Sequence, residues 1–195
     1  MAGRPRQFDR DQALIKARNL FWRQGYEGTS MSDLVAELGI ASARIYKAFG
    51  SKEQLFREAI ADYENQEGSF ADRALAAGGT VRDTLQTLLM DAVHLYCHPD
   101  LPQGCMVVAS AASVSAENEP IKTWLAQHRL QRTQIIDRLH QAVQNGELPD
   151  TTDAESLGDY FAVFLHGLSV QARDGVPESR LQAAVKQALN LLPPS

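Results

Sequence analysis

Helix start signals recur along the whole chain and constrain its fold more than any other feature. Each signal is a small polar residue followed three positions later by an acid or an amide, a pair that can bind the free N–H groups of a first helical turn. They occur at Asp9–Gln12, Ser30–Asp33, Ser51–Gln54, Thr80–Asp83 and Thr152–Glu155. Apolar residues between them recur with the helical period, and no stretch shows sustained period-two alternation. The sequence therefore predicts an all-α fold.

Glycines that can end a helix divide these periodic runs. Three short helices are expected first, at residues 9–24, 31–38 and 43–49. Six more are expected at residues 52–68, 80–98, 103–115, 119–145, 153–174 and 178–191. With a compositional boundary near Ser51, we expect an N-terminal three-helix domain over residues 1–51 and a six-helix domain over residues 52–195.

Charge is distributed unevenly between these two parts. The whole chain has a formal net charge of −5. Residues 1–52 hold nine Lys and Arg against five Asp and Glu, whereas the remainder holds ten against nineteen. A basic N-terminal part on an acidic body can bind phosphates locally, although chance surface charge would give the same count.

Composition narrows the class of protein further. No run of eighteen apolar residues is present to form a membrane span, and the polar N-terminus does not resemble a secretory signal. Two cysteines, Cys97 and Cys105, do not make a disulfide framework. We expect a cytoplasmic protein without membrane contact.

The second and third expected helices are joined by the short segment Gly39-Ile40-Ala41-Ser42. Two short helices across a glycine turn, supported by a longer first helix, are typical of a helix-turn-helix. Ala41 or Ser42 could cap the third helix. Its outer face would carry short and basic side chains suited to the major groove of DNA.

Residues 13–56, ALIKARNLFWRQGYEGTSMSDLVAELGIASARIYKAFGSKEQLF, resemble the N-terminal signature of the tetracycline-repressor (TetR) family. The resemblance continues more weakly at residues 104–108 and 164–189. It implies a homodimeric repressor of double-stranded, palindromic operator DNA, paired through its last two helices and released by a small-molecule effector of unknown identity. A regulator of the same fold without an effector stays open. A further alternative is an all-α enzyme, but the sequence contains no catalytic motif that would support it.

Candidate DNA contacts follow from position and chemistry. Arg44 can pair with guanine, Ala43 can touch a thymine methyl, and Ser42 is short enough to let the helix approach. Thr29 and Ser30 lie at a helix N-terminus that can hold phosphate. Tyr46 and Lys47 resemble phosphate contacts of the family, beside Lys52, although Tyr46 could equally pack in the core. Arg4 and Arg6 flank a proline and would lie in a minor groove, unless this arm is an ordinary tail.

The C-terminal part offers weaker candidates. Apolar stripes at Phe161, Leu165, Leu168 and Ala172, and at Leu181, Ala184, Val185, Ala188 and Leu192, suit a four-helix dimer interface or the monomer core. Gly158 and Gly167 would allow close approach there. A ligand pocket is expected among Met90, Tyr96, Met106, Trp124, His128 and Phe161, with a filled core as the alternative.

We expect no cofactor and no metal. His94, Cys97, His98 and Cys105 have spacing that could bind zinc or copper. However, the stretch GCMVV (residues 104–108) that holds Cys105 resembles a packing feature of the family, and a His-Pro pair at a helix end is commonplace. A redox switch between Cys97 and Cys105 is equally weakly supported.

Overall fold

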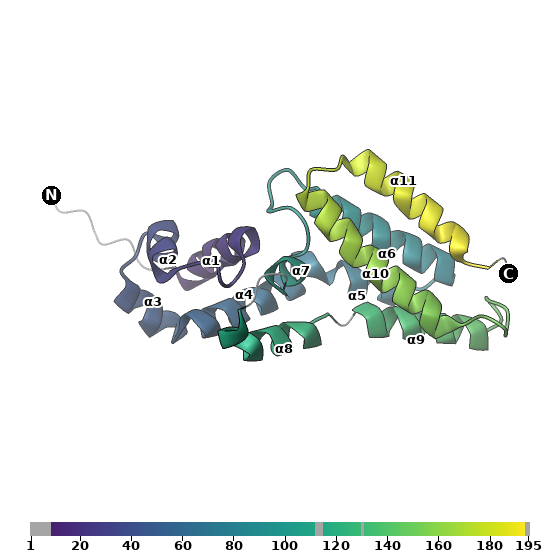
Figure 1. Cartoon of the computed structure of the whole chain (residues 1–195), viewed down its shortest axis with the longest axis horizontal. Coiled ribbons are helices and arrows are strands. Elements are labelled where there is room, and N and C mark those ends of the chain that lie inside the picture. The colour runs from purple at the N-terminus through teal and green to yellow at the C-terminus, as the bar shows by residue number, and fades with distance from the viewer. Residues whose placement is uncertain (1–8, 112–114, 130, 194–195) are drawn as a thin grey trace.

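Figure 1 shows the computed structural model, which describes residues 9–111, 115–129 and 131–193. The described residues form helices and connecting segments without a strand, so the all-α prediction is confirmed. Helices α1 (Arg10–Gln24), α2 (Met31–Leu38) and α3 (Ser42–Phe49) form a head at one end. Helix α4 (Lys52–Asn65) runs from the head into the body.

The described residues of the body form seven further helices. They are α5 (Phe70–Ala76), α6 (Val81–Tyr96), α7 (Met106–Ala111), α8 (Glu119–Gln127), α9 (Gln131–Gln144), α10 (Ala154–Arg173) and α11 (Glu178–Ala188). Short 3-10 turns lie at Glu67–Ser69, Ala116–Asn118 and Leu189–Leu191. Helices α6, α10 and α11 lie side by side at the end opposite the head, and α8 lies beneath α4 (Figure 1).

Most of the expected start signals cap the helices as predicted. Ser30 with Asp33 and Thr80 with Asp83 form reciprocal capping boxes, and Ser51 accepts the Gln54 N–H. The signal at Thr152 is wrong by one residue. Asp153 caps α10 by accepting the Ser156 N–H at 3.0 Å.

Three features of the body differ from the expected helix boundaries. The helix expected at residues 103–115 is described over Met106–Ala111 (α7), and residues 103–105 and Ser115 are not helical. The expected helix at residues 119–145 is two helices, α8 and α9, which pack on different neighbours. Apolar Leu125 and Ile135 remain close to three helical turns apart, so the apolar pattern did not reveal the break. After α4 the chain bends at Gln66, and the short helix α5 that follows was not expected.

One apolar core extends from the head into the body. In the head–α4 contact, Phe21 meets Phe56 edge-on with ring centroids 5.1 Å apart, and Trp22 meets Tyr63 at 4.7 Å. All four side chains are buried. Burial of aromatic surface on both sides of this contact holds α1 to α4.

None of the helices described here combines the length and the apolar character that a membrane-spanning helix needs.

Candidate nucleic-acid interface

Helices α2 and α3 meet at a tight turn with the geometry of a helix-turn-helix. Gly39 ends α2 with φ of 68°, a left-handed conformation that glycine adopts without strain. Leu34, Ile45 and Phe49 are buried beneath the turn and fix the angle between the helices. Helix α3 starts at Ser42, with Ala41 in the capping position. Ser42 is therefore the first helical residue and not the cap, and alanine offers no hydroxyl to the first N–H groups of α3.

The outer face of α3 carries the side chains expected there. Ser42, Ala43, Arg44 and Lys47 are exposed, and Tyr46 is 48% exposed. Exposure of Tyr46 places its ring on the surface and not in the core. Since α3 stands at the outer end of the molecule, an extended polar ligand can reach this face (Figure 1).

The two residues before α2 are placed differently from each other. Thr29 is fully buried, and its hydroxyl donates to the Gly25 carbonyl at 2.7 Å. Ser30 is exposed, and its hydroxyl lies 2.6 Å from the Asp33 carboxylate. Hydrogen bonds from Ser30 lower the pKa of Asp33 below its ordinary value. Thr29 therefore holds the turn, and Ser30 is the member of the pair that solvent or a phosphate can reach.

Lys52 lies at the start of α4 beside the same turn. Its ammonium is 4.2 Å from the centre of the Tyr26 ring, a cation–π contact. Burial lowers the pKa of Lys52, and the carboxylates of Glu27 and Asp33 oppose that shift. Arg4 and Arg6 lie outside the described residues.

Three arginines counted in the basic head form ion pairs. Arg18 is nearly buried and binds Asp62 at 2.8 Å and both carboxylate oxygens of Glu67 at 2.8 Å. Arg10 binds Glu58 at 2.7 Å, and Arg23 binds Glu37 at 3.1 Å on the surface. Sequence reasoning missed these roles, because the partners of Arg10 and Arg18 lie 44 to 49 residues further along the chain.

Arg10 also touches α3 itself. Its Nε donates to the Ala48 carbonyl at 3.3 Å, and its guanidinium lies 4.5 Å from the centre of the Phe49 ring. A cation at the C-terminal end of α3 is favourable for the helix dipole. Arg10 therefore fixes α3 to α4 through Glu58.

Glu27 links the head to the body ahead of α8. Its carboxylate accepts from the Ser115 N–H at 3.0 Å, the Ser115 hydroxyl at 2.7 Å and the Asn118 amide at 2.7 Å. These hydrogen bonds lower the pKa of Glu27. The turn before α2 is thereby tied to the segment that opens α8.

The six candidate ligand residues fall into two groups. Tyr96, Met106 and Phe161 are fully buried in the core. Met90, Trp124 and His128 are partly buried. The centre of the Trp124 ring lies 4.5 Å from the Arg57 guanidinium carbon and 4.0 Å from the centre of the His128 ring.

His128 also contacts a carboxylate of α4. Its Nδ1 lies 2.9 Å from a carboxylate oxygen of Glu64. Burial raises the pKa of Glu64, and the hydrogen bond with His128 opposes that shift. This polar cluster sits where α8 covers α4.

The four candidate metal ligands are not gathered into a metal site. Among the described residues no group of three or more His, Cys, Asp or Glu could hold a metal ion. His94 faces Glu178 at 3.6 Å. Cys105 is buried beside the Tyr63 hydroxyl at 3.5 Å, and burial raises the pKa of its thiol. Cys97 and Cys105 are both unbridged.

The apolar stripes expected at a dimer interface are mostly buried within the monomer. The exposed apolar face of α10 is a different one, with Val163 72% exposed, Val170 48% and Tyr160 39%. Gly158 faces α9, where a Cβ atom would lie 2.3 Å from Ile136. Gly167 lines an open groove of about 670 Å³ between α10 and α11.

Comparison with known proteins agrees with the helix-turn-helix. Residues 14–59 match the family model "Bacterial regulatory proteins, tetR family", and residues 85–188 match "Tetracyclin repressor-like, C-terminal domain". The chain is 31% identical over 193 residues to the HTH-type transcriptional repressor ComR of Escherichia coli (strain K12), covering 98% of this chain and 92% of ComR. It is 27% identical to the HTH-type transcriptional repressor BdcR of the same strain, covering 95% and 90%.

A solved structure is similar over the full length. The TetR family transcriptional regulator CifR, a triple cysteine mutant in complex with 26-bp double-strand operator DNA, is 39% identical with a TM-score of 0.92. The match covers 98% of this chain and 100% of that one. The chain therefore belongs to the TetR family of bacterial transcriptional regulators, and α2–α3 is its helix-turn-helix.

Proposed function

We propose that this chain is a dimeric transcriptional repressor that acts in the cytoplasm, with α3 of each subunit in the major groove of a palindromic operator. The observation that carries the proposal is the outer face of α3, which presents Ala43, Arg44 and Lys47 at one end of the molecule. CifR binds operator DNA with the same fold at 39% identity, and ComR is a repressor.

Each exposed group of the head has a chemical role in this proposal. Arg44 reads a guanine edge with its planar fork, and Lys47 and Tyr46 bind phosphate beside it. Ser30 and the N–H groups that open α2 and α3 hold further phosphates. Lys52 adds positive charge at the same edge, while Thr29 keeps the turn in place. Arg4 and Arg6 would follow the minor groove.

Pairing of two subunits follows from the need to read two half-sites, whose centres lie about 34–36 Å apart or somewhat further. The exposed stripe at Tyr160, Val163 and Val170, together with the α10–α11 groove, supports pairing through the last two helices. A row of exposed apolar side chains on one helix face is the kind of patch that marks an interaction surface, and a second copy could cover it.

A small molecule bound in the body would release the operator. The partly buried side chains Trp124 and His128, beside Glu64 and Arg57, support a site of aromatic and polar groups where α8 covers α4, and Met90 is partly buried on α6. The alternative is the same regulator without an effector. A thermal-shift screen of small apolar and amphipathic compounds separates the two, because only the first gains stability from a ligand that also weakens DNA binding.

The direct test is binding to DNA. Purified protein is titrated with its own upstream region and with fragments selected from random DNA, at two salt concentrations. We expect saturable binding to a palindrome with an affinity that falls steeply with salt. Absence of specific binding to either DNA set would overturn the proposal. Turnover of a substrate together with that absence would revive the enzyme alternative.

A further inference from the structure

Arg173, the last residue of α10, binds the end of a head helix. Its Nη1 donates to the Trp22 carbonyl at 3.2 Å, and its Nη2 donates to the Arg23 carbonyl at 3.3 Å. Nη1 also donates to the Gln103 carbonyl at 3.2 Å. Trp22 and Arg23 belong to the last turn of α1, where carbonyls lack partners within the helix and carry partial negative charge. A guanidinium suits that position well.

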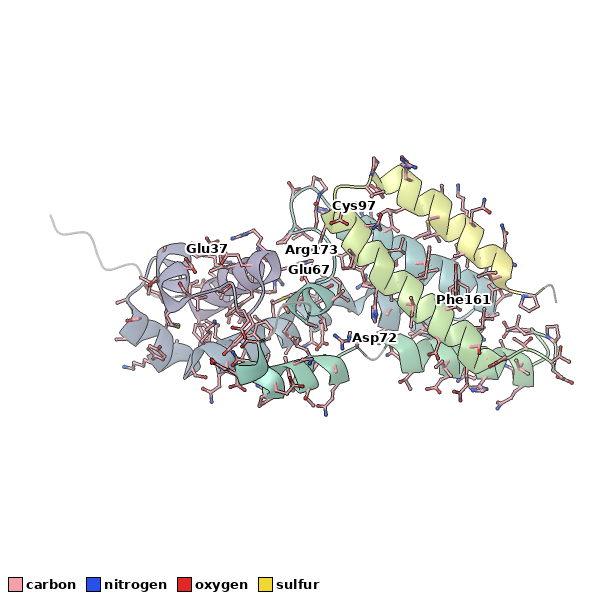
Figure 2. The ribbon with its side chains drawn as sticks, in the orientation of Figure 1. Glu37, Glu67, Asp72, Cys97, Phe161 and Arg173 are labelled. Atoms are coloured by element: carbon pink, nitrogen blue, oxygen red, sulfur yellow. The ribbon has the colours of Figure 1, made fainter. Side chains whose placement is uncertain are left out.

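Arg173 is exposed overall, and its aliphatic stem packs against Gly104 of the α6–α7 loop. Gly104 has φ of 77°, and a Cβ atom there would lie 2.7 Å from Arg173 Cγ and 2.8 Å from the Ser169 carbonyl oxygen. The Trp22 indole N–H donates to the Gly104 carbonyl at 3.0 Å. The Cys105 N–H donates to the Ser169 hydroxyl at 2.8 Å. The α6–α7 loop is thus held between α1 and α10, and Figure 2 shows Arg173 where the head meets the body.

Helix α10 also carries the exposed apolar stripe, and Arg173 lies three residues beyond Val170 of that stripe. A shift of α10 at the pairing surface therefore moves the group that holds the end of α1. Because α1 packs on α2 and α4, the head would follow as a unit.

We propose that Arg173 is a positioning residue that sets the orientation of the head relative to α10, and so the distance between the two recognition helices of a dimer. This inference rests on the proposed function. In this proposal Arg173 makes no contact with DNA. Loss of the Arg173 side chain should therefore change the preferred half-site spacing more than it changes the binding of each half-site.

The experiment uses operators whose two half-sites are separated by one base pair fewer, the natural number, or one more. Arg173→Gln is compared with wild type and with Arg173→Lys, which keeps the charge. Arg82→Gln is the matched control, because Arg82 is an exposed arginine of α6. It donates to the carbonyl of Leu192 at 3.4 Å, close to the C-terminus, which lies at the end opposite the head (Figure 1).

We expect wild type and Arg82→Gln to share one sharp spacing optimum. Arg173→Gln should bind about tenfold more weakly at that optimum and less than about threefold more weakly at the other spacings. Arg173→Lys should fall between them, since an ammonium cannot bind all three carbonyls in the same planar geometry. An equal loss at every spacing, or no loss, would overturn the inference.

A second readout separates this inference from the proposed function, because it needs neither DNA nor an effector. Hydrogen exchange of the peptide spanning residues 20–30 should be at least about threefold faster in Arg173→Gln than in Arg82→Gln. In Arg173→Gln the exchange of α11 should be the same as in wild type. Unchanged exchange there would overturn the positioning role even if wild type binds its operator. Faster exchange without specific DNA binding would support the contact and remove the proposed function.

Discussion

Different kinds of contact hold the head and the body of this chain. The head is fixed to α4 and the body by polar groups of defined geometry, at Arg10, Arg18, Glu27 and Arg173, over an aromatic core. The body is held mainly by apolar helix faces. At Gly158, for example, α10 lies so close to α9 that a Cβ atom would meet Ile136 at 2.3 Å. Hydrogen bonds specify an orientation, whereas apolar area supplies stability. The orientation of the head therefore depends on a few directional contacts in addition to the shared apolar core, whereas the body depends mainly on apolar packing.

The largest expected effect belongs to the apolar half of this comparison. Phe161→Ala should lower the free energy of unfolding by about 3–5 kcal/mol, because Phe161 is fully buried and truncation leaves a cavity. Urea unfolding measures it. A loss below about 1 kcal/mol together with stronger binding of small apolar compounds would mean that Phe161 lines a pocket and not the core.

Arg18→Met tests the polar half. The substitution leaves the carboxylates of Asp62 and Glu67 without their guanidinium in a half-buried site, and we expect a loss of about 3 kcal/mol by urea unfolding. Arg23→Met is the control, because its pair with Glu37 is exposed and should contribute at most about 1 kcal/mol. Equal effects of the two substitutions would show that burial of the Arg18 pair is unimportant.

Glu27→Gln tests a second polar contact of the head, with a smaller expected loss of stability than Arg18→Met. The pKa of Glu27 is lowered in the folded chain, so its charge adds stability above the ordinary value of 4.5, and that stability is lost as pH falls through the lowered pKa. The variant should lose less than about 1 kcal/mol near neutral pH and show a shallower acid decline. An unchanged acid decline would remove the Glu27 contact from the account.

His166 gives the smallest expected effect, within the body. Burial lowers the pKa of His166 below its ordinary value of 6.5, and nearby Arg129 adds to this shift. The unfolded chain takes up a proton near 6.5 before the folded chain does, so stability falls as pH drops through that value. His166→Gln should flatten the decline between about pH 7.5 and about pH 5.5 in thermal unfolding, while the exposed control His140→Gln should keep it.

The same division explains what could be predicted from the sequence. Local signals predicted α2, the glycine turn and α3, because capping and turn chemistry act within a few residues. The ties from Arg18 and Arg173 join residues far apart in the chain, and a basic residue looks alike whether it binds phosphate or a carboxylate. The break between α8 and α9 leaves the apolar period intact, so the period could not reveal it. Thr29 and Ser30 are adjacent hydroxyl residues that look equivalent in the sequence, and only the fold shows that Thr29 is buried and Ser30 exposed.

The most direct test of the account compares Arg44→Ala and Lys47→Ala with wild type on a selected palindrome and on its single-base variants. We predict that Arg44→Ala relaxes sequence preference at one position of each half-site, at about 1–3 kcal/mol per contact. Lys47→Ala should weaken binding to every sequence alike and reduce the salt slope by about 1 per subunit. Unchanged preference and unchanged salt slope in both variants would contradict the assignment of α3 as the helix that reads DNA.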